Sequence, residues 1–381
     1  MSRPVRILAI DVGTGTQDIL LFESEKTIEN SFKLIMPSPT IIVAEHIKRA
    51  TSLGQPILLT GVTMGGGPCH WAARDHALTG YRVVVTEEAA RTFDDDLTQV
   101  EKMGFEVISE AEGQRYLEAG ELLHIEMQDF NAQAIITAFQ AFNIDAKVDA
   151  LAIAAFDHGA APPGVSDRRF RFEFIEEIVK RTPLPSAFAY MATQIPPTLT
   201  RLQAVATSAV RYIELSGSRP DIPLLLMDTG SAAALGVLED SLVREQRECI
   251  LCNIGNFHTL AFHLIDGQII GTFEHHTGEL TRPQLEELLL KLANGTLSND
   301  EVFNTSGHGA LILSSSSSRA EYFPLLAVTG PRRELLRDST LRPYEAVPHG
   351  DMMITGCFGL LRALADQQPA LAPAIEPALL H

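Results

Sequence analysis

Two segments far apart in the chain repeat one pattern: an apolar strand, an acid or amide, a turn centred on glycine, and a second strand. Residues 7–22 carry the first copy, with Asp11 before the turn, and residues 249–262 carry the second, with Asn253 in the same place. Glycine in such a turn permits positive φ, so that backbone N–H groups can converge on an anion. Two such hairpins half a chain apart predict a nucleotide held between two related domains.

The glycine spacing excludes the better-known phosphate loops. After Gly13 and Gly15, the dinucleotide-binding fingerprint requires a third glycine where the chain has Asp18. Residues 61–66 approach the Walker spacing, but residues 67–68 are Gly-Pro where Lys and Ser or Thr are required. A β-hairpin therefore fits the first segment better than a strand-to-helix loop.

The length of 381 residues allows two domains with ample core. The sequence Ser-Gly-Ser-Arg-Pro at 216–220 is the best linker candidate. We therefore expect a first domain over 1–215 and a second over 216–381, with the last helix, near 353–366, free to pack back on the first domain.

Composition narrows the classes of partner. A hydrophobic fraction of 45% with 20% charged residues is typical of a soluble globular protein. The net charge of -18 argues against nucleic acid or an anionic membrane as the main partner. The first residues lack the pattern of a signal peptide, and no apolar run reaches the ~18 residues of a membrane span. We expect a cytoplasmic location.

Local patterns indicate an α/β fold. Residues 40–86 alternate helical and strand patterns, which predicts a largely parallel sheet. A helix is expected near 126–142, followed by a strand over 148–155. Ser231 is expected to cap the alanine-rich helix 232–239.

The order of hairpin, second hairpin and strand–Thr-Gly–helix resembles the actin / Hsp70 / sugar-kinase superfamily of ATP-binding proteins. The segment Asp11–Phe22 is similar to its first phosphate motif, and Asn253–Thr259 to its second, with an amide where an Asp is usual. Residues 327–333 resemble the adenosine motif, with Pro331 where a second Gly is common, and residues 348–357 resemble the segment after it.

This resemblance implies an α/β fold of two ribonuclease-H-like, actin-like ATPase domains flanking a nucleotide cleft, with ATP and Mg²⁺ as cofactors. Asp11 would hold Mg²⁺ through water, since Mg²⁺ prefers oxygen ligands, or else it only caps the turn. A second carboxylate would come from Asp228, unless Asp228 is only part of a strand-to-helix turn. The residues implied to contact the nucleotide are Gly13, Thr14, Gly15, Thr16, Asn253, Gly255, Asn256, His258, Thr259, Thr329, Gly330 and Pro331.

Residues 228–233 and 274–278 further resemble a prokaryotic family often labelled "pyruvate formate-lyase activating enzyme-related". That label conflicts with the cysteines, because a radical-SAM activase needs three thiolates in a CxxxCxxC loop to hold its iron–sulfur cluster. The chain has four cysteines and no such triplet. Cys249 and Cys252 form one CxxC inside a predicted strand, where we expect them to be core residues. We therefore expect no radical-SAM activity.

Candidate chemistry gathers at the end of the strand over 148–155, where open α/β sheets meet their ligands. Asp157 could accept a hydroxyl proton or position water for phosphoryl transfer. Asp228 is the second candidate for a catalytic residue. The candidate substrate contacts are Gly65, Gly66, His158, Arg168, Glu274, His275 and His276.

Two of these candidates have alternatives. Arg168 could bind an anion or simply be solvated at a helix start. Glu274, His275 and His276 could hold Zn²⁺ or Fe²⁺, but neighbouring strand residues point to opposite faces, so a structural or substrate-contacting role is preferred.

Two function classes remain open. One is an ATP-dependent phosphotransferase or ATPase acting on an unidentified small molecule. The other is a nucleotide-gated interaction protein, in which ATP only sets domain closure. The chain has no separate peptide-binding domain like that of Hsp70, which favours the enzyme, and a deep polar pocket beyond the γ-phosphate would favour it further.

Overall fold

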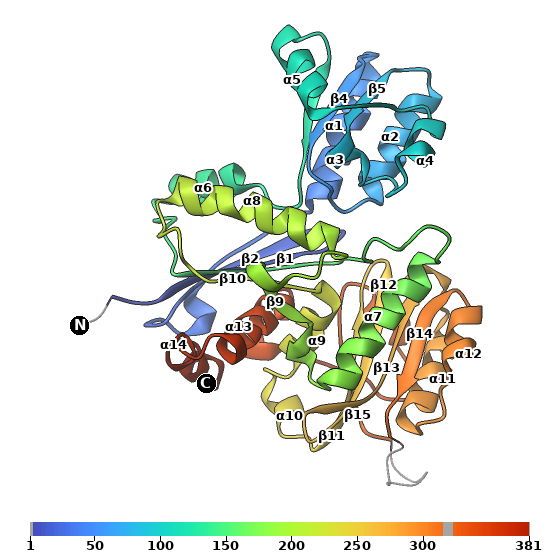
Figure 1. Ribbon diagram of the computed structural model, residues 1–381. Helices are drawn as coiled ribbons and strands as arrows, with labels where there is room; N and C mark the ends of the chain where they lie inside the picture. The colour runs from blue at the N-terminus through green and yellow to red at the C-terminus, as the bar shows by residue number, and fades with distance from the viewer. Residues whose placement is uncertain (1–2, 315–322, 381) are drawn as a thin grey trace.

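Two six-stranded sheets with the same layout dominate the computed structural model, which describes residues 3–314 and 323–380 (Figure 1). In each sheet an antiparallel meander that contains the glycine hairpin is followed by two parallel strands, and one further antiparallel strand lies at an edge. From edge to edge the first sheet consists of β3 (Phe32–Pro37), β2 (Thr16–Glu23), β1 (Arg6–Val12), β8 (Ala150–Ala155), β10 (Leu224–Met227) and β9 (Ala189–Met191).

Five strands of the second sheet repeat five of the first, with the second hairpin at the centre, and the sixth strand is added at opposite ends of the two sheets. The strands of the second sheet are β14 (Gly307–Ile312), β13 (Gln268–His276), β12 (His258–Ile265), β11 (Glu248–Ile254), β15 (Leu325–Thr329) and β16 (Tyr344–Glu345). The repeated order confirms the predicted α/β fold of two ribonuclease-H-like domains. Strand β10 completes the first sheet, although it follows the division expected at residue 216.

Helices cover both faces of each sheet, because the central strands are apolar on both sides. Strands β1 and β11 even share one order of buried and half-buried positions. The first sheet packs on α6 (Ala132–Ala141) and α8 (Thr200–Ser216) on one side. On the other side lie α9 (Thr229–Val237), α13 (Thr355–Gln367) and α14 (Ala372–Leu380).

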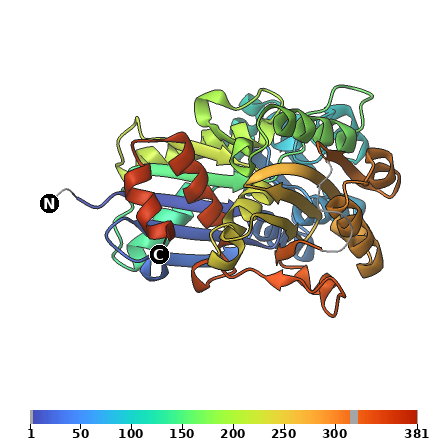
Figure 2. The same ribbon diagram turned by 90° about the horizontal axis from the view of Figure 1, so that it is seen from below.

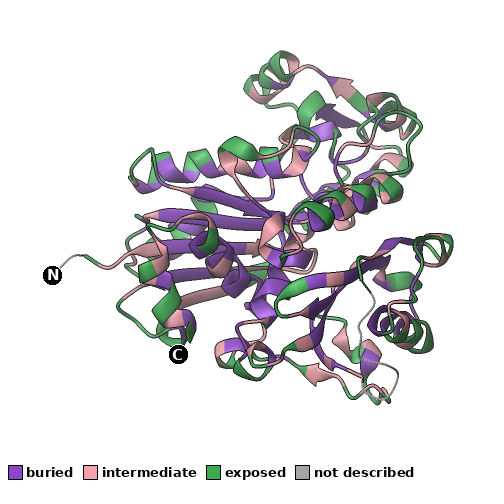
Figure 3. Ribbon diagram, turned by 60° about the horizontal axis from the view of Figure 1, so that its bottom comes forward, coloured by how far each residue is buried: buried purple, intermediate pink, exposed green. Residues whose placement is uncertain are grey.

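The C-terminal helices pack back on the first sheet, as Figure 2 shows from below. Helix α9 lies against both sheets and against α13. Gly236 and Gly359 allow this close approach: a Cβ at either position would lie within 2 Å of a backbone carbonyl oxygen of the facing segment. The α9–α13 pair therefore joins the two hairpin sheets. Figure 3 shows the strands and these helices buried and the outer helices partly exposed.

The second sheet is covered by α11 (Arg282–Ala293) and α12 (Asn299–Asn304) on its outer face. Helix α7 (Asp167–Arg181) lies against β14 on the opposite side. The remaining short elements are α10 (Ser241–Arg244), η1 (Ile28–Asn30), η2 (Pro185–Phe188), η3 (Ala192–Gln194), η4 (Thr277–Glu279), η5 (Arg333–Leu336) and η6 (Pro348–Gly350).

A third, four-stranded parallel sheet forms an insert over residues 39–127, between β3 and β8 (Figure 1). Its strands are β6 (Glu106–Ile108), β5 (Val83–Thr86), β4 (Ile57–Gly61) and β7 (Leu123–Met127). Its helices are α1 (Pro39–Leu53), α2 (Pro68–Leu78), α3 (Glu87–Ala90), α4 (Leu97–Lys102) and α5 (Glu110–Ala119). The parallel sheet predicted for 40–86 is confirmed, but the helix expected from 126 begins only at α6, because β7 occupies its start.

Across the part of the chain that the structure describes, none of the helices combines the length and apolar composition needed to span a membrane.

Candidate functional site

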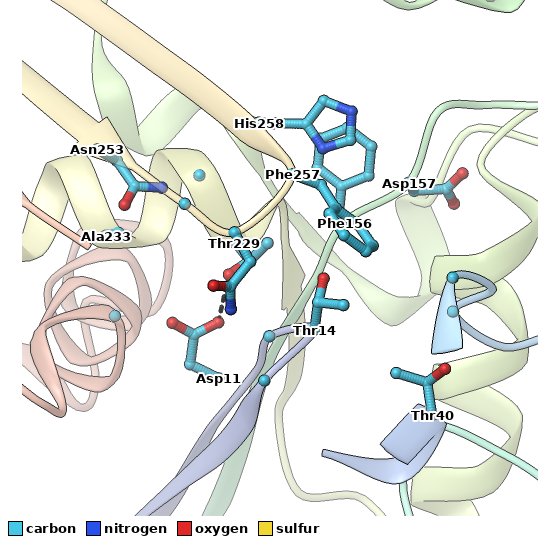
Figure 4. A pocket seen from close by; sticks show the side chains of 18 of the residues that line it. Asp11, Thr14, Thr40, Phe156, Asp157, Thr229, Ala233, Asn253, Phe257 and His258 are labelled. Atoms are coloured by element: carbon cyan, nitrogen blue, oxygen red, sulfur yellow. Dashed lines mark hydrogen bonds between the residues drawn. The ribbon is translucent and has the colours of Figure 1, made fainter. Parts of the chain in front are cut away.

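A cavity of about 620 Å³ lies between the two glycine hairpins and extends toward the insert. Figure 4 places Asp11 and Thr229 in one part of it, and Asp157 apart from them near Phe156. The predicted site residues that line the cavity are Asp11, Gly13, Thr14, Gly15, Thr16, Gly65, Gly66, Asp157, His158, Asn253, Gly255, Asn256, His258, Glu274, Thr329, Gly330 and Pro331. Those outside its lining are Arg168, Asp228, Thr259, His275 and His276.

The two hairpin turns have one geometry. Gly13 N–H donates to the Thr16 carbonyl at 2.9 Å, and Gly255 N–H donates to the His258 carbonyl at the same distance. The turns also meet across the cleft, since a Cβ on Gly15 would lie 2.8 Å from Asn256 Nδ2. The hairpins therefore face each other, as their shared pattern predicts.

Asp11 is the acidic centre of the first hairpin. Its Oδ1 accepts a 2.5 Å hydrogen bond from the Thr229 hydroxyl at the start of α9. Burial, and next the carboxylate of Asp18, raises the pKa of Asp11 to about 8, although the Thr229 hydroxyl opposes this shift. Gly356 is required beside it, because a Cβ there would lie 1.9 Å from Asp11 Oδ2. Among the described residues no ion pair joins Asp11, which is half-buried, to a cationic side chain, so this carboxylate fits a divalent cation that would restore its charge.

Asp18 is a site residue that the sequence reasoning missed. It pairs with Asp11 across the β1–β2 hairpin and lines the cavity. Burial raises the pKa of Asp18 to about 7, against the effect of the Thr16 hydroxyl. The register of a hairpin closed at Gly13 and Thr16 was the signal, because residues paired across a hairpin point to the same face.

Asp228 lies outside the cavity lining, and both of its carboxylate oxygens accept hydrogen bonds. Its Oδ1 accepts the backbone N–H of Ser231 at 3.1 Å, and its Oδ2 accepts from Arg171 Nη2 at 2.8 Å. Asp228 thus caps α9, and the expectation that Ser231 is the cap is wrong. The fully buried Arg171 also donates to both carboxylate oxygens of Glu274, at 2.9 and 3.1 Å. This ion-pair network ties the first domain to β13 of the second.

Asp157 lies where the sequence predicts it, just beyond β8, and it is buried. One oxygen accepts the N–H of Gly159 at 2.8 Å and the other the N–H of Leu202 at 2.9 Å. Burial raises the pKa of Asp157, although these two hydrogen bonds and Arg201 favour its ionised form. The carboxylate is thereby held in one orientation beside the cavity.

The glycine loop of the insert approaches the second hairpin. Gly65 N–H donates to the carboxylate of Asp129, which Arg201 also binds through two nitrogens, at 2.6 and 3.0 Å. Gly67 has φ of +67°, and a Cβ there would lie 2.7 Å from the Phe257 ring. Trp71 of α2 packs edge-on against the same ring. The glycines of this loop thus make room for the Arg201 side chain and for Phe257 of the facing hairpin.

Three predicted residues have structural contacts. Arg168 donates to the carbonyls of Phe303 at 3.2 Å and Gly307 at 2.6 Å, which anchors α7 to β14. Thr259 is buried, with its hydroxyl 2.9 Å from that of Thr277. His275 faces away from the cavity, and its Nε2 lies 3.3 Å from the Thr305 hydroxyl.

The four cysteines are buried free thiols on three different elements, α2, β11 and α13. Burial raises the pKa of Cys249 and of Cys252 to about 12, which keeps both thiols protonated. The CxxC pair on β11 thus belongs to the strand's packing, as the sequence predicts.

Comparison with solved structures gives matches of low identity. A ROK family transcriptional regulator, described as a homolog of the E. coli MLC protein, matches at 10% identity and a TM-score of 0.23 over 69% of this chain and 37% of that chain. The ROK hexokinase from Thermus thermophilus matches at 9% identity and a TM-score of 0.24 over 70% of this chain and 48% of that chain. The chain therefore spans less than half the length of either.

A third match covers both chains almost completely. It is Lmo2764 from Listeria monocytogenes, described as "a putative N-acetylmannosamine kinase", at 10% identity and a TM-score of 0.35 over 96% of this chain and 100% of that chain. The repeated strand order, rather than these distant similarities, identifies the fold.

A search of the curated proteins finds no match. Residues 64–335 match the protein family described as "Putative pyruvate format-lyase activating enzyme (DUF1786)". Because this match covers well over half of the chain, the protein belongs to the DUF1786 family.

Proposed function

We propose that the protein binds Mg-ATP between the two hairpins and transfers the terminal phosphoryl group to a small molecule or to water. The observation that carries the proposal is the pair of equivalent glycine turns that open into one cavity from two repeated sheets. Backbone N–H groups in such turns bind phosphate oxygens without any side-chain charge. The net charge of -18 makes nucleic acid and anionic membranes poor partners.

The first hairpin would hold the metal ion. Asp11 and Asp18 supply the two carboxylates, and Asp18 replaces Asp228 in this role because Asp228 is occupied by Arg171 and Ser231. Thr14, Gly15 and Thr16 would contact the β- and γ-phosphates, and Thr329, Gly330 and Pro331 the adenosine. Bound Mg²⁺ supplies charge neutralisation for the phosphates.

The far part of the cavity favours an enzyme over a nucleotide-gated switch. Beyond the hairpins it is lined by Gly65 and Gly66 and by the polar side chains of Arg201, Asp157 and His158. A protein in which ATP only sets domain closure needs no such acceptor space. Asp157 would orient the acceptor hydroxyl or water there, while Asp228 acts as a positioning residue through Arg171.

The proposal is tested by calorimetry with Mg-ATP and by a metabolite screen for ATP turnover. We expect Asp157→Asn to lower turnover by about 10²–10⁴-fold, as loss of a positioned general base commonly does, while Mg-ATP affinity stays within about two-fold of wild type. Asp221→Asn, in the exposed linker, is the matched control, and all variants are first compared by melting temperature. Binding of NADH without binding of Mg-ATP would contradict the nucleotide assignment, and full turnover by Asp157→Asn the catalytic one.

A further inference from the structure

Four histidines from separate parts of the chain converge at one end of the cavity. His158 follows β8, His258 begins β12, His276 ends β13, and His308 lies in β14. The rings of His276 and His308 are 4.7 Å apart by centroid, and His258 lies 5.0 Å from each of them. His158 is 5.3 Å from His258. We call these four residues the histidine cluster.

A β-bulge brings His308 into the cluster. On β13 the residues Glu274 and His275 are neighbours, but their partners on β14 are Gly309 and Gly307, so His308 is the extra residue between them. Such a bulge turns a side chain toward the face of the sheet opposite to the one it would have in regular pairing. His308 consequently shares its surroundings with Glu274 and His276, whereas His275 points away.

A buried carboxylate orients His308. Its Nδ1 lies 2.8 Å from Glu274 Oε2, and Glu274 is held in turn by Arg171. A carboxylate at one ring nitrogen directs the other toward a metal ion, as in carboxylate–histidine–zinc arrangements. The other nitrogen of His308, Nε2, lies 3.3 Å from His276 Nε2.

The cluster also contains ligand atoms without other partners. His258 Nε2 is buried and has no hydrogen-bond partner among the described residues, while its ring stacks on Phe156 at 4.0 Å. One ring nitrogen from each of His158, His258 and His308 lies within 4.8 Å of the other two. His158 and His276 keep some surface toward solvent, so an ion can reach the cluster.

We propose that the histidine cluster binds one divalent transition-metal ion of the Zn²⁺ class, separate from the Mg²⁺ at Asp11. Imidazole nitrogens suit Zn²⁺, Fe²⁺ and similar ions better than Mg²⁺. Tetrahedral Zn²⁺ with ligands at ~2.0–2.1 Å spaces its nitrogens ~3.4 Å apart. The pair His276–His308 already has this spacing at 3.3 Å, and the ligand atoms of His158, His258 and His308 lie within 4.8 Å of one another. Because His158 and His258 line the cavity, the ion faces it and offers a contact for an oxygen of the substrate.

The test uses the full chain and the metal alone, so that its outcome is independent of ATP. The protein is stripped with a chelator and titrated with Zn²⁺ by calorimetry, and with Co²⁺ by visible absorption. We expect one ion per chain and the intense visible bands of tetrahedral Co²⁺. His158→Gln and His276→Gln should each weaken Zn²⁺ binding by about 100-fold. Loss of a residue that only hydrogen-bonds to a metal ligand already lowers metal affinity by up to about 100-fold, and these variants remove a ligand itself.

His46→Gln is the matched control, because His46 is exposed on α1 and outside the cluster. His158 keeps exposed surface, so its variant should fold, and its melting temperature checks this. The proposal is overturned if stripped wild type takes up no stoichiometric Zn²⁺ or Co²⁺. It is also overturned if folded His158→Gln and His276→Gln bind Zn²⁺ as tightly as His46→Gln. In that case the four rings only pack against one another and, through His158 and His258, against Phe156.

Discussion

The two hairpins have nearly one backbone but different side chains. Both close with the same 2.9 Å hydrogen bond, and both central strands neighbour a parallel strand at the same place in the sheet. Where the first hairpin pairs Asp11 with Asp18, the second pairs Asn253 with Leu260. Where the first has Thr16, the second has His258 at the edge of the histidine cluster.

This difference shows that turn geometry and ligand chemistry are set separately. The glycine turn supplies convergent N–H donors in both copies, whatever the side chains beside it are. The carboxylate pair makes the first hairpin a partner for a hard cation, whereas the amide and imidazole make the second neutral. The paired carboxylates consequently belong to the first hairpin alone.

The largest expected effect comes from making the first hairpin like the second. Asp11→Asn should weaken Mg-ATP binding by roughly 100-fold, because a charged hydrogen-bonding group contributes about 1.5–3 kcal/mol. Asn253→Ala, the equivalent change in the second hairpin, should weaken it by less than about 10-fold, since only a neutral group is lost. Both affinities are measured by calorimetry, with and without Mg²⁺. Equal losses of Mg-ATP affinity in the two variants would contradict the assignment of the metal ion to the first hairpin.

The junction between the hairpin sheets should be the next most sensitive. A Cβ on Gly359 of α13 would lie 1.9 Å from the Ala232 carbonyl oxygen of α9. Gly359→Ala should therefore lower the free energy of unfolding by about 2 kcal/mol, measured by chemical denaturation. Gly278→Ala is the control, because a Cβ there meets nothing within 4 Å. Unchanged stability in Gly359→Ala would show that the helix pair can separate without cost.

The smallest effect concerns the carboxylate pair in the absence of divalent ions. The pKa values of Asp11 and Asp18 are raised from 3.8 to about 8 and about 7, so the folded state holds protons that the unfolded chain releases. The stability from this protonation is fully present below pH 4 and is lost as pH rises through 7 and 8. Asp18→Asn should raise the melting temperature by about 2 °C at pH 8 and leave it unchanged at pH 4.

Asp221→Asn, which changes an exposed carboxylate, should show no such dependence on pH. A lower melting temperature for Asp18→Asn than for wild type at pH 8 would contradict repulsion within the pair.

The sequence predicted local features and missed the long-range ones. Both hairpins could be predicted because alternating apolar residues and a glycine turn act within about fifteen residues of chain. Strand β7 was missed because its exposed and buried positions alternate just before the apolar helix α6, whose pattern dominates that stretch.

The ion-pair network around Arg171 could not be predicted from the sequence. Arg171 meets Asp228 and Glu274, which lie 57 and 103 residues away along the chain. Asp228 at a strand end looks the same whether it faces a metal ion or caps a helix. Only the fold shows that α7 brings an arginine to it. The histidine cluster depends likewise on the bulge at His308. The flanking Gly307 and Gly309 are compatible with a bulge, but they do not reveal which strand it faces.

The contact of the insert with the second hairpin has an experimental use. Trp71 is the only tryptophan in the chain, its side chain is about half exposed, and its ring centroid lies 5.8 Å from that of Phe257. Any movement that widens the cleft on this side must carry α2 away from the hairpin turn and expose the indole to more water. The chain therefore contains its own fluorophore at the mouth of the cleft, and its emission can follow opening and closure without a label.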